Sequence, residues 1–210
     1  MSSQKKSKIY ISSEVKEFDE FFKIAKNKGF GVEVQAFAFP EIMYGNWMKE
    51  LIHYKDTLKD FEYGIALHNV FFSTEIVSPD YKIVDITKEK MRYGFMIGKE
   101  IGAKIIIAHF YWWPFYRGNA FKIYMEGQLK FWDEFVNFAE KENIMIVMEN
   151  TTETRPDFIL PIVEKINSSC FQLIWDVGHA NLFSEIPLEE WVKAVSYTHL
   201  RAHETSLHLV

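Results

Sequence analysis

Five residues of the kinds that bind metals or move protons stand at the ends of strongly hydrophobic runs. They are His68, His109, Glu149, Asp176 and His179. The runs are YGIALHN (63–69), KIIIAHF (104–110), IMIVMEN (144–150) and FQLIWDVGH (171–179). A buried parallel strand is apolar on both faces, so a polar residue at its end marks where the strand leaves the core. Four consecutive strands that end in this way predict that one rim of a sheet gathers carboxylates and imidazoles into a site.

Glu149 and Asp176 are the strongest candidates for metal ligands. A charged carboxylate at the end of an apolar strand is costly unless it is paired or bound to a metal. For each of them, the alternative is a cap on the next helix or an ion pair with a lysine. His179 comes three residues after Asp176, and Gly178 allows a tight turn that folds its ring back over the rim, as a ligand or a substrate contact. A loop histidine bonded to the backbone is the alternative for His179.

His68 and His109 each follow three or four apolar residues. A single histidine in such a place is usually a core residue with satisfied hydrogen bonds. Because the two histidines recur at equivalent strand positions, we expect both to belong to the site.

Strand-like and helix-like segments alternate along the whole chain. Strands are predicted over 8–12 and 31–37 and in the four runs above, and helices over 15–28, 46–59, 84–101, 120–142 and 156–168, with a last helix opening at Pro187. Such alternation favours a parallel sheet with crossover helices, in an open doubly wound sheet or in a (β/α)8 barrel. No glycine-rich phosphate turn follows the first strand, and polar ends occur on strands two to six. Both observations favour the α/β TIM barrel.

Six β/α units are too few for a barrel of eight strands, which needs about 250 residues. We therefore expect a barrel truncated after about six units, with a disordered tail over 1–7, a partial barrel over 8–195 and a non-native tail over 196–210. The tail SYTHLRAHET resembles a peptide found at the ends of many unrelated translated sequences, which arises from sequencing-adapter DNA. Its His199, His203 and Glu204 form HxxxHE, which differs from the HExxH pattern of zinc proteases.

The composition fits one globular domain and excludes several classes of protein. The chain has 210 residues, 48% hydrophobic and 17% aromatic, and a formal net charge of −5. An acidic chain lacks the basic surface typical of nucleic-acid binding, although such a chain can still carry a local basic groove. One cysteine excludes a disulfide framework and a zinc site built from cysteines. No run approaches the roughly 20 apolar residues of a membrane span, and the first residues lack the apolar segment of a signal peptide. We expect a cytoplasmic protein.

Five segments, GVEVQAF, LHN, IIIAHFYWW, VMENT and WDVGHANL, occur in an order that resembles the xylose isomerase-like TIM-barrel superfamily. The resemblance covers about residues 8–195, and DVGHAN with the upstream EN is its most specific part. The superfamily contains sugar-phosphate isomerases and epimerases and the endonuclease IV group. In the isomerases and epimerases, a divalent metal is held by a Glu, an Asp, a His and a Glu on strands five to eight. The resemblance assigns Glu149 and Asp176 to the first two, and the other two have no counterpart here.

The resemblance also assigns roles to other residues. His179 matches a histidine that contacts substrate, or a zinc in the endonucleases. His68 and His109 match zinc ligands of the endonucleases and pocket residues of many isomerases. Glu33 matches a glutamate on strand two that lines the pocket, with a salt bridge between helix and strand as the alternative. The loop 111–119 follows His109 directly.

In that loop, Trp112, Trp113 and Phe115 could wall a sugar pocket, and Arg117 could bind a phosphate. The alternative is that this loop packs on an outer helix.

The implied reaction is proton abstraction next to a carbonyl. A divalent metal (Mn, Mg, Co or Zn) would polarise the carbonyl and stabilise the enediolate, while Glu149 and His179 would be catalytic and move the proton. The expected ligand is a small sugar or sugar phosphate, a homo-oligomer is allowed, and the printed chain is expected to be inactive because two metal ligands are missing.

Two rival functions remain open. The first is endonuclease IV-like zinc phosphodiesterase activity on abasic DNA. The acidic charge argues against it, as does the Val-Gly inside WDVGH, where the endonucleases have a polar Thr-Cys pair. The second is a barrel that binds a polyol without catalysis.

Overall fold

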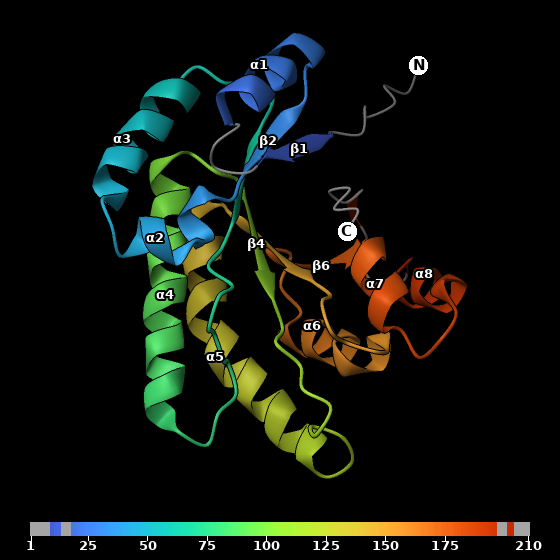
Figure 1. The fold of residues 1–210 in the computed structure, drawn as a ribbon. Helices are drawn as coiled ribbons and strands as arrows, with labels where there is room; N and C mark the ends of the chain where they lie inside the picture. The colour runs from blue at the N-terminus through green and yellow to red at the C-terminus, as the bar shows by residue number, and fades with distance from the viewer. Residues whose placement is uncertain (1–8, 14–17, 197–200, 204–210) are drawn as a thin grey trace.

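In the part of the chain that the structure describes, seven parallel strands form one sheet and lie side by side in the order of the sequence. This computed structural model describes residues 9–13, 18–196 and 201–203. The strands are β1 (Tyr10–Ser13), β2 (Gly31–Val34), β3 (Ile65–His68), β4 (Ile105–His109), β5 (Met145–Glu149), β6 (Phe171–Asp176) and β7 (Arg201–His203). Sequential parallel order is the order of a (β/α) barrel. Within the described residues β1 and β7 do not pair, so the fold is an open, partial barrel (Figure 1).

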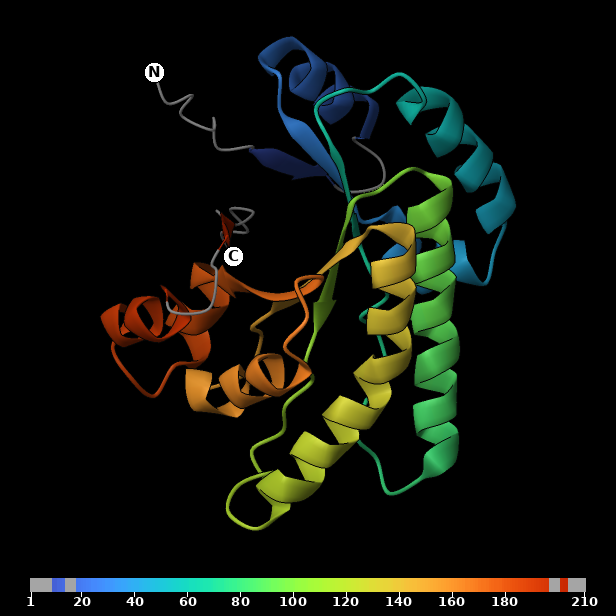
Figure 2. The same ribbon diagram turned by 180° about the vertical axis from the view of Figure 1, so that it is seen from behind.

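The helices lie outside the sheet, and the two longest run side by side in both views (Figures 1 and 2). They are α1 (Phe18–Lys28), α2 (Pro40–Met43), α3 (Trp47–Leu58), α4 (Tyr81–Glu100), α5 (Ala120–Glu142), α6 (Leu160–Ile166), α7 (Val177–Phe183) and α8 (Leu188–Ser196). Three of them end before a residue with a left-handed backbone, at Gly29 (φ 70°), Asn143 (φ 53°) and Asn167 (φ 47°). Glycine and asparagine tolerate this conformation, which stops a helix and returns the chain to the next strand.

The core divides according to the two faces of the strands. On one face, Ile106, Ile146 and Leu173 join a large buried cluster with residues of α4, α5 and α8. Ile107 and Val147, the alternate residues, form a small separate cluster with Ile174. Successive strand residues point to opposite faces, so this small cluster lies on the face turned away from the helices, which is the interior of a barrel.

The structure confirms an α/β TIM-barrel fold of partial extent and corrects several predicted boundaries. The strand predicted over 31–37 ends at Val34 and is followed by a 3₁₀ turn over Ala36–Ala38. The helix predicted over 156–168 is split into a 3₁₀ turn and α6.

The loop expected after Asp176 is the helix α7. In the segment predicted to be a non-native tail, β7 pairs with β6. The tail predicted over 1–7, together with His199 and Glu204, lies outside the described residues.

Among the described residues, no helix has the length and apolar character needed to cross a lipid bilayer.

Candidate active site at the carboxyl ends of the strands

Glu149 lies at the centre of the five residues that the sequence placed at strand ends. Its Oε2 is 3.6 Å from His68 Nε2 and 3.7 Å from His109 Nε2. Its Oε1 is 3.3 Å from His179 Nδ1, and this nitrogen is also 3.7 Å from Asp176 Oδ2. The predicted residues therefore form one cluster at the carboxyl rim, which is the face that carries the active sites of TIM barrels.

Strand register explains why these side chains meet. His109 and Glu149 are direct partners across β4 and β5, and His68 pairs with Ile107 across β3 and β4. Asp176 is the last residue of β6, two positions beyond the residue that pairs with Glu149. Because all four strands are parallel, their carboxyl ends face the same rim.

The three histidines keep Glu149 ionised although it is nearly buried, with a side chain only 14% exposed. Burial alone raises the pKa of this carboxyl, but the facing imidazoles of His109, His179 and His68 outweigh burial and hold the pKa well below its usual range. The cluster thus contains a carboxylate that stays negatively charged and is shared by three imidazoles.

The rings of His68 and His109 both direct Nε2 toward Glu149. His68 Nδ1 donates a hydrogen bond to the main-chain oxygen of Asn69 at 3.0 Å, which leaves Nε2 to face the carboxylate. Burial lowers the pKa of His68, but the hydrogen bond to Glu149 and the nearby Glu33 raise it above its usual value. Burial lowers the pKa of His109, whose Nε2 is buried and has no hydrogen-bond partner among the described residues. A neutral imidazole with a free lone pair is the form that binds metals.

Asp176 and His179 are fixed by the start of α7. The Asp176 carboxylate accepts a hydrogen bond from the His179 main-chain N–H at 2.7 Å and so caps the helix. Burial raises the pKa of Asp176. His179 Nδ1 donates to the main-chain oxygen of Asn150 at 3.0 Å. The hydrogen bond with Glu149 raises the pKa of His179 to about 9. Asp176 therefore caps a helix and also belongs to the cluster, and its role as a metal ligand stays a prediction.

The side chains of the cluster fit a divalent metal. Two groups have ligand atoms that all lie within 4.8 Å of one another, namely His68 with His109 and Glu149, and Glu149 with Asp176 and His179. Ligands bound about 2.0–2.1 Å from a tetrahedral zinc lie about 3.3 Å from one another. The separations of 3.6 and 3.7 Å around Glu149 Oε2 are close to that value. In the second group, Nδ1 of His179 already donates to Asn150, so Glu149 and Asp176 are its available ligands.

Glu33 is buried in β2 and accepts a hydrogen bond from Gln35 at 3.0 Å. Its charge contributes to the raised pKa of His68. A pocket role for Glu33 stays a prediction.

The structure does not bring the aromatic and basic residues of the loop after β4 into the cluster. Trp112 is only 2% exposed and stacks on Phe158 with ring centroids 4.4 Å apart. Trp113 is 53% exposed and stacks on Phe115. Arg117 lies over the Trp112 ring and binds Glu185 at 2.6 Å. Trp112 is therefore a residue of the core. Substrate contacts for Trp112, Trp113 and Arg117 stay predictions.

Two aromatic residues that the sequence reasoning missed contact the histidines instead. The Phe71 ring meets His68 edge-on at 4.9 Å and lies 5.7 Å from His109. The Tyr111 ring lies 5.6 Å from His109, and its backbone has φ 55°. A positive φ is uncommon for a bulky residue and is often found at functional sites. The available signal was position, since both aromatics follow a strand-end histidine by two or three residues.

Asn150 was also missed, although the EN pair is visible in the sequence. Its side chain bonds to both main-chain groups of Asp176.

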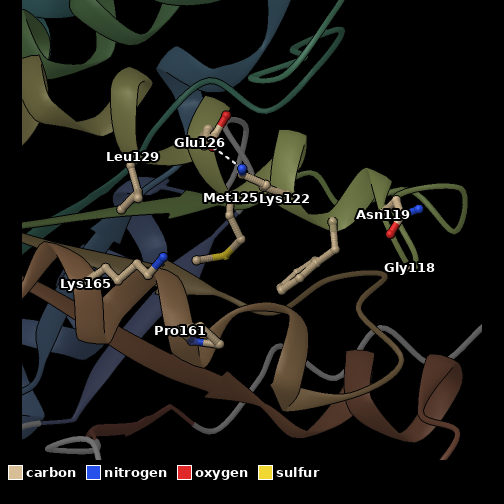
Figure 3. Close-up of a pocket in the computed structure, with 9 residues that line it drawn as sticks. Gly118, Asn119, Lys122, Met125, Glu126, Leu129, Pro161 and Lys165 are labelled. Carbon is tan, nitrogen blue, oxygen red and sulfur yellow. Dashed lines mark ion pairs between the residues drawn. The ribbon is translucent and has the colours of Figure 1, made fainter.

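A groove of about 580 Å³ lies between α5 and α6 (Figure 3). Its lining consists of Gly118, Asn119, Phe121, Lys122, Met125, Glu126, Leu129, Pro161 and Lys165. None of the predicted site residues lines it, so it gives no support for a substrate site there.

Comparison with known proteins agrees with the fold. A protein from Methanocaldococcus jannaschii is 25% identical over 166 residues, which are 74% of this chain and 56% of that protein. The chain therefore spans little more than half the length of this curated relative.

Among solved structures, a D-tagatose 3-epimerase-like protein matches with a TM-score of 0.71 and 21% identity, over 94% of this chain and 76% of its own. A Thermus thermophilus protein soaked with zinc chloride matches with a TM-score of 0.70 and 18% identity, over 89% and 73%. At these identities the likeness shows the fold.

The family described as xylose isomerase-like TIM barrel matches residues 18–208, which are most of the chain. The match agrees with the parallel sheet. The chain belongs to the xylose isomerase-like TIM-barrel family.

Proposed function

We propose that the protein is a metal-dependent isomerase or epimerase of a sugar or sugar phosphate, which abstracts a proton next to a carbonyl. The observation that carries the proposal is the pair of carboxylates, Glu149 and Asp176, at the ends of neighbouring strands on the carboxyl rim. Membership of the family and the likeness of the fold to that of a sugar epimerase-like protein support it.

Glu149 and Asp176 would hold a divalent cation in this proposal. A bound cation would polarise the substrate carbonyl and stabilise the enediolate. Glu149 is the candidate base, because its carboxylate lies at the centre of the cluster, between the imidazoles of His68, His109 and His179. His179 is the candidate partner in proton transfer. Its Nδ1 is engaged by Asn150 and Glu149, so Nε2 is left to exchange a proton with a substrate oxygen.

An apolar wall beside these polar groups suits a sugar. Phe71 and Tyr111 lie against the two histidines and offer ring surface to the apolar face of a sugar, while the imidazoles and carboxylates meet its hydroxyl groups. Mixed walls of this kind are typical of small-molecule sites.

Exchange of a carbon-bound hydrogen with solvent tests the proposal directly. Ketoses and their phosphates are incubated in D₂O with Mn²⁺, Mg²⁺, Co²⁺ or Zn²⁺, and loss of the proton signal next to the carbonyl is followed by NMR. Glu149→Gln should slow exchange by about 10²–10⁴-fold, whereas Glu126→Gln, on the exposed side of α5, should not change it. Equal exchange rates in the two variants would refute the role of Glu149.

The assay should compare two proteins, namely the 210-residue chain and the longer protein translated from the gene past codon 195. We propose that residues 196–210 are not native and that further ligands follow residue 195, so turnover is expected in the longer product alone.

A zinc phosphodiesterase acting on abasic DNA is a second candidate. The group formed by His68, His109 and Glu149 favours it, because two imidazoles and one carboxylate form a typical zinc ligand set. Cleavage of an abasic duplex together with several zinc ions per chain would support this candidate.

Binding of a polyol that survives Glu149→Ala, without turnover by the longer protein, would support a barrel that binds without catalysis. The cytoplasmic location and a homo-oligomer remain proposals.

A further inference from the structure

Asn150 joins the ends of β5 and β6 at the point where their regular pairing stops. Pairing between the strands ends at Glu149 and Ile174, one residue before Asn150. Beyond it, Asn150 Nδ2 donates to the main-chain oxygen of Asp176 at 3.0 Å, and Asn150 Oδ1 accepts from the Asp176 main-chain N–H at 2.7 Å. One amide side chain thus bonds both main-chain groups of a single residue on the neighbouring strand. The Asn150 side chain is buried, with the residue 1% exposed.

Only an amide can make this pair of bonds at this length. A primary amide offers a donor and an acceptor together, whereas a carboxylate accepts only and an aliphatic chain does neither. Both partners on Asp176 belong to the main chain, so they stay in place whatever side chain stands at position 176. The geometry therefore requires asparagine at position 150 in order to hold the backbone of Asp176.

The main-chain oxygen of Asn150 orients the third member of the cluster. It accepts a hydrogen bond from His179 Nδ1 at 3.0 Å. A carbonyl oxygen cannot donate, so Nδ1 must carry the proton, and the ring turns Nε2 away from Asn150. Asn150 directly follows Glu149 in the chain, and it bonds both the backbone of Asp176 and the ring of His179.

We propose that Asn150 is a positioning residue that sets the separation of Glu149 and Asp176 and the orientation of His179. This rests on the proposed function of the same site. Loss of its side chain leaves two buried main-chain groups of Asp176 without partners and lets the end of β6 move away from β5. Asp176 also caps α7 through the His179 N–H, so the same displacement carries the helix and the His179 ring with it.

The affinity of the 210-residue chain for Co²⁺ tests whether Asn150 sets the separation of Glu149 and Asp176. Asn150→Ala is expected to weaken Co²⁺ binding by about 10–100-fold, the effect usual for partners that orient metal ligands. Asn150→Asp keeps the acceptor for the Asp176 N–H but loses the donor, so its affinity should fall less.

Asn137→Ala is the matched control, because its Nδ2 also bonds a main-chain oxygen, that of Asp133, on the exposed side of α5. Leu58→Ala lowers stability in the other part of the core and should leave Co²⁺ affinity unchanged.

The ring of His179 gives a readout that needs no metal. In the metal-free chain, ¹⁵N-labelled histidine should show a low-field Nδ1 proton that exchanges slowly with water and is absent in His179→Gln. This signal should be lost in Asn150→Ala and kept in Asn137→Ala and Leu58→Ala. If Asn150→Ala does not fold, Asn150→Asp takes its place with the same direction of change.

Wild-type affinity and an unchanged Nδ1 signal in a folded Asn150 variant would overturn the proposal. So would a loss of affinity in Leu58→Ala equal to that in Asn150→Ala, because the effect would then follow stability alone. If the wild-type chain binds no Co²⁺ but the Nδ1 signal responds as expected, the proposed metal fails and the positioning of His179 by Asn150 stands.

Discussion

Gly94 in α4 allows the helix to approach the end of β3, and Gly94→Ala should push the two apart. An added Cβ would overlap Asn69 Oδ1 and lie 2.7 Å from Asn69 Cγ. Asn69 cannot swing into solvent, because it is 1% exposed, and its Oδ1 accepts a hydrogen bond from the Val70 N–H at 2.7 Å. The variant must therefore displace a buried side chain and break that bond.

The cost of this change can be worked from its parts. Overpacking of a core typically costs about 1–3 kcal/mol, and a buried N–H without a partner costs about 1–3 kcal/mol. Alanine in place of glycine within a helix returns about 1 kcal/mol. We expect a net loss of about 3 kcal/mol in the free energy of unfolding. For a chain of this size that lowers Tm by about 6–12 °C.

Gly98 on the same helix provides the matched control. A Cβ there would lie 3.0 Å from Ile106 Cδ1 and 3.4 Å from Leu67 Cδ2, which are the mobile ends of aliphatic side chains. Gly98→Ala should stay within about 1 kcal/mol of the wild type, because the gain in helix propensity offsets a small adjustment. Thermal and urea unfolding followed by circular dichroism compare the two variants.

The double variant Gly94→Ala with Asn69→Ala removes the atoms that collide. It should be more stable than the sum of the two single changes, since the clash exists only when both side chains are present. Equal stabilities of Gly94→Ala and Gly98→Ala, or strict additivity in the double variant, would refute the reasoning.

Three other features lead to measurable expectations. Burial raises the pKa of Glu153 from 4.5 to about 7, so between these pH values the folded protein holds a proton that the unfolded chain has lost, and this group's contribution to stability falls as pH rises across that window. Glu153→Gln should remove this dependence. Measured by urea unfolding, the variant's free energy of unfolding relative to that of the wild type should be higher at pH 8 than at pH 5 by about 1–3 kcal/mol. Parallel pH profiles of the two free energies would contradict this expectation. Trp112→Ala should cost about 3–5 kcal/mol and the exposed Trp113→Ala about 0.5 kcal/mol or less, and comparable urea midpoints would disprove the core position of Trp112. Resequencing the gene beyond codon 195 should reveal a His at the end of a seventh native strand and a Glu at the end of an eighth; continuation of the tail as printed would exclude this.

The alternation of segments predicted the strand order, and the strand-end residues predicted the rim, because both depend on local pattern. Six apolar runs of strand length separated by helical stretches leave little choice but a parallel sheet. The carboxyl ends of such strands meet at one rim whatever the details of packing. His68, His109, Glu149 and Asp176 could therefore be grouped without coordinates.

What the sequence left open was decided by register and by packing between distant segments. The central place of Glu149 depends on its pairing with His109, and one residue of slip would turn its side chain to the other face of the sheet. The sequence offered Trp112 as a candidate for the site and did not point to Phe71. Trp112 is in the core because Phe158, far along the chain, stacks on it.

The helix α7 was missed for a local reason. Asp176 is at once the end of a strand and an N-cap, and the seven helical residues that follow contain a glycine at the second position. A short helix with an early glycine has little propensity of its own, so its cap decides whether it forms.

The two oxygens of Glu149 are divided between different neighbours. Oε2 faces His68 and His109, and Oε1 faces His179. A carboxylate is a rigid planar group, so a torsion that improves the position of one oxygen displaces the other. A ligand near β3 and β4 that displaces Glu149 Oε2 would therefore also displace Oε1 beside His179, and thermodynamic linkage requires any resulting change of affinity to be equal in both directions.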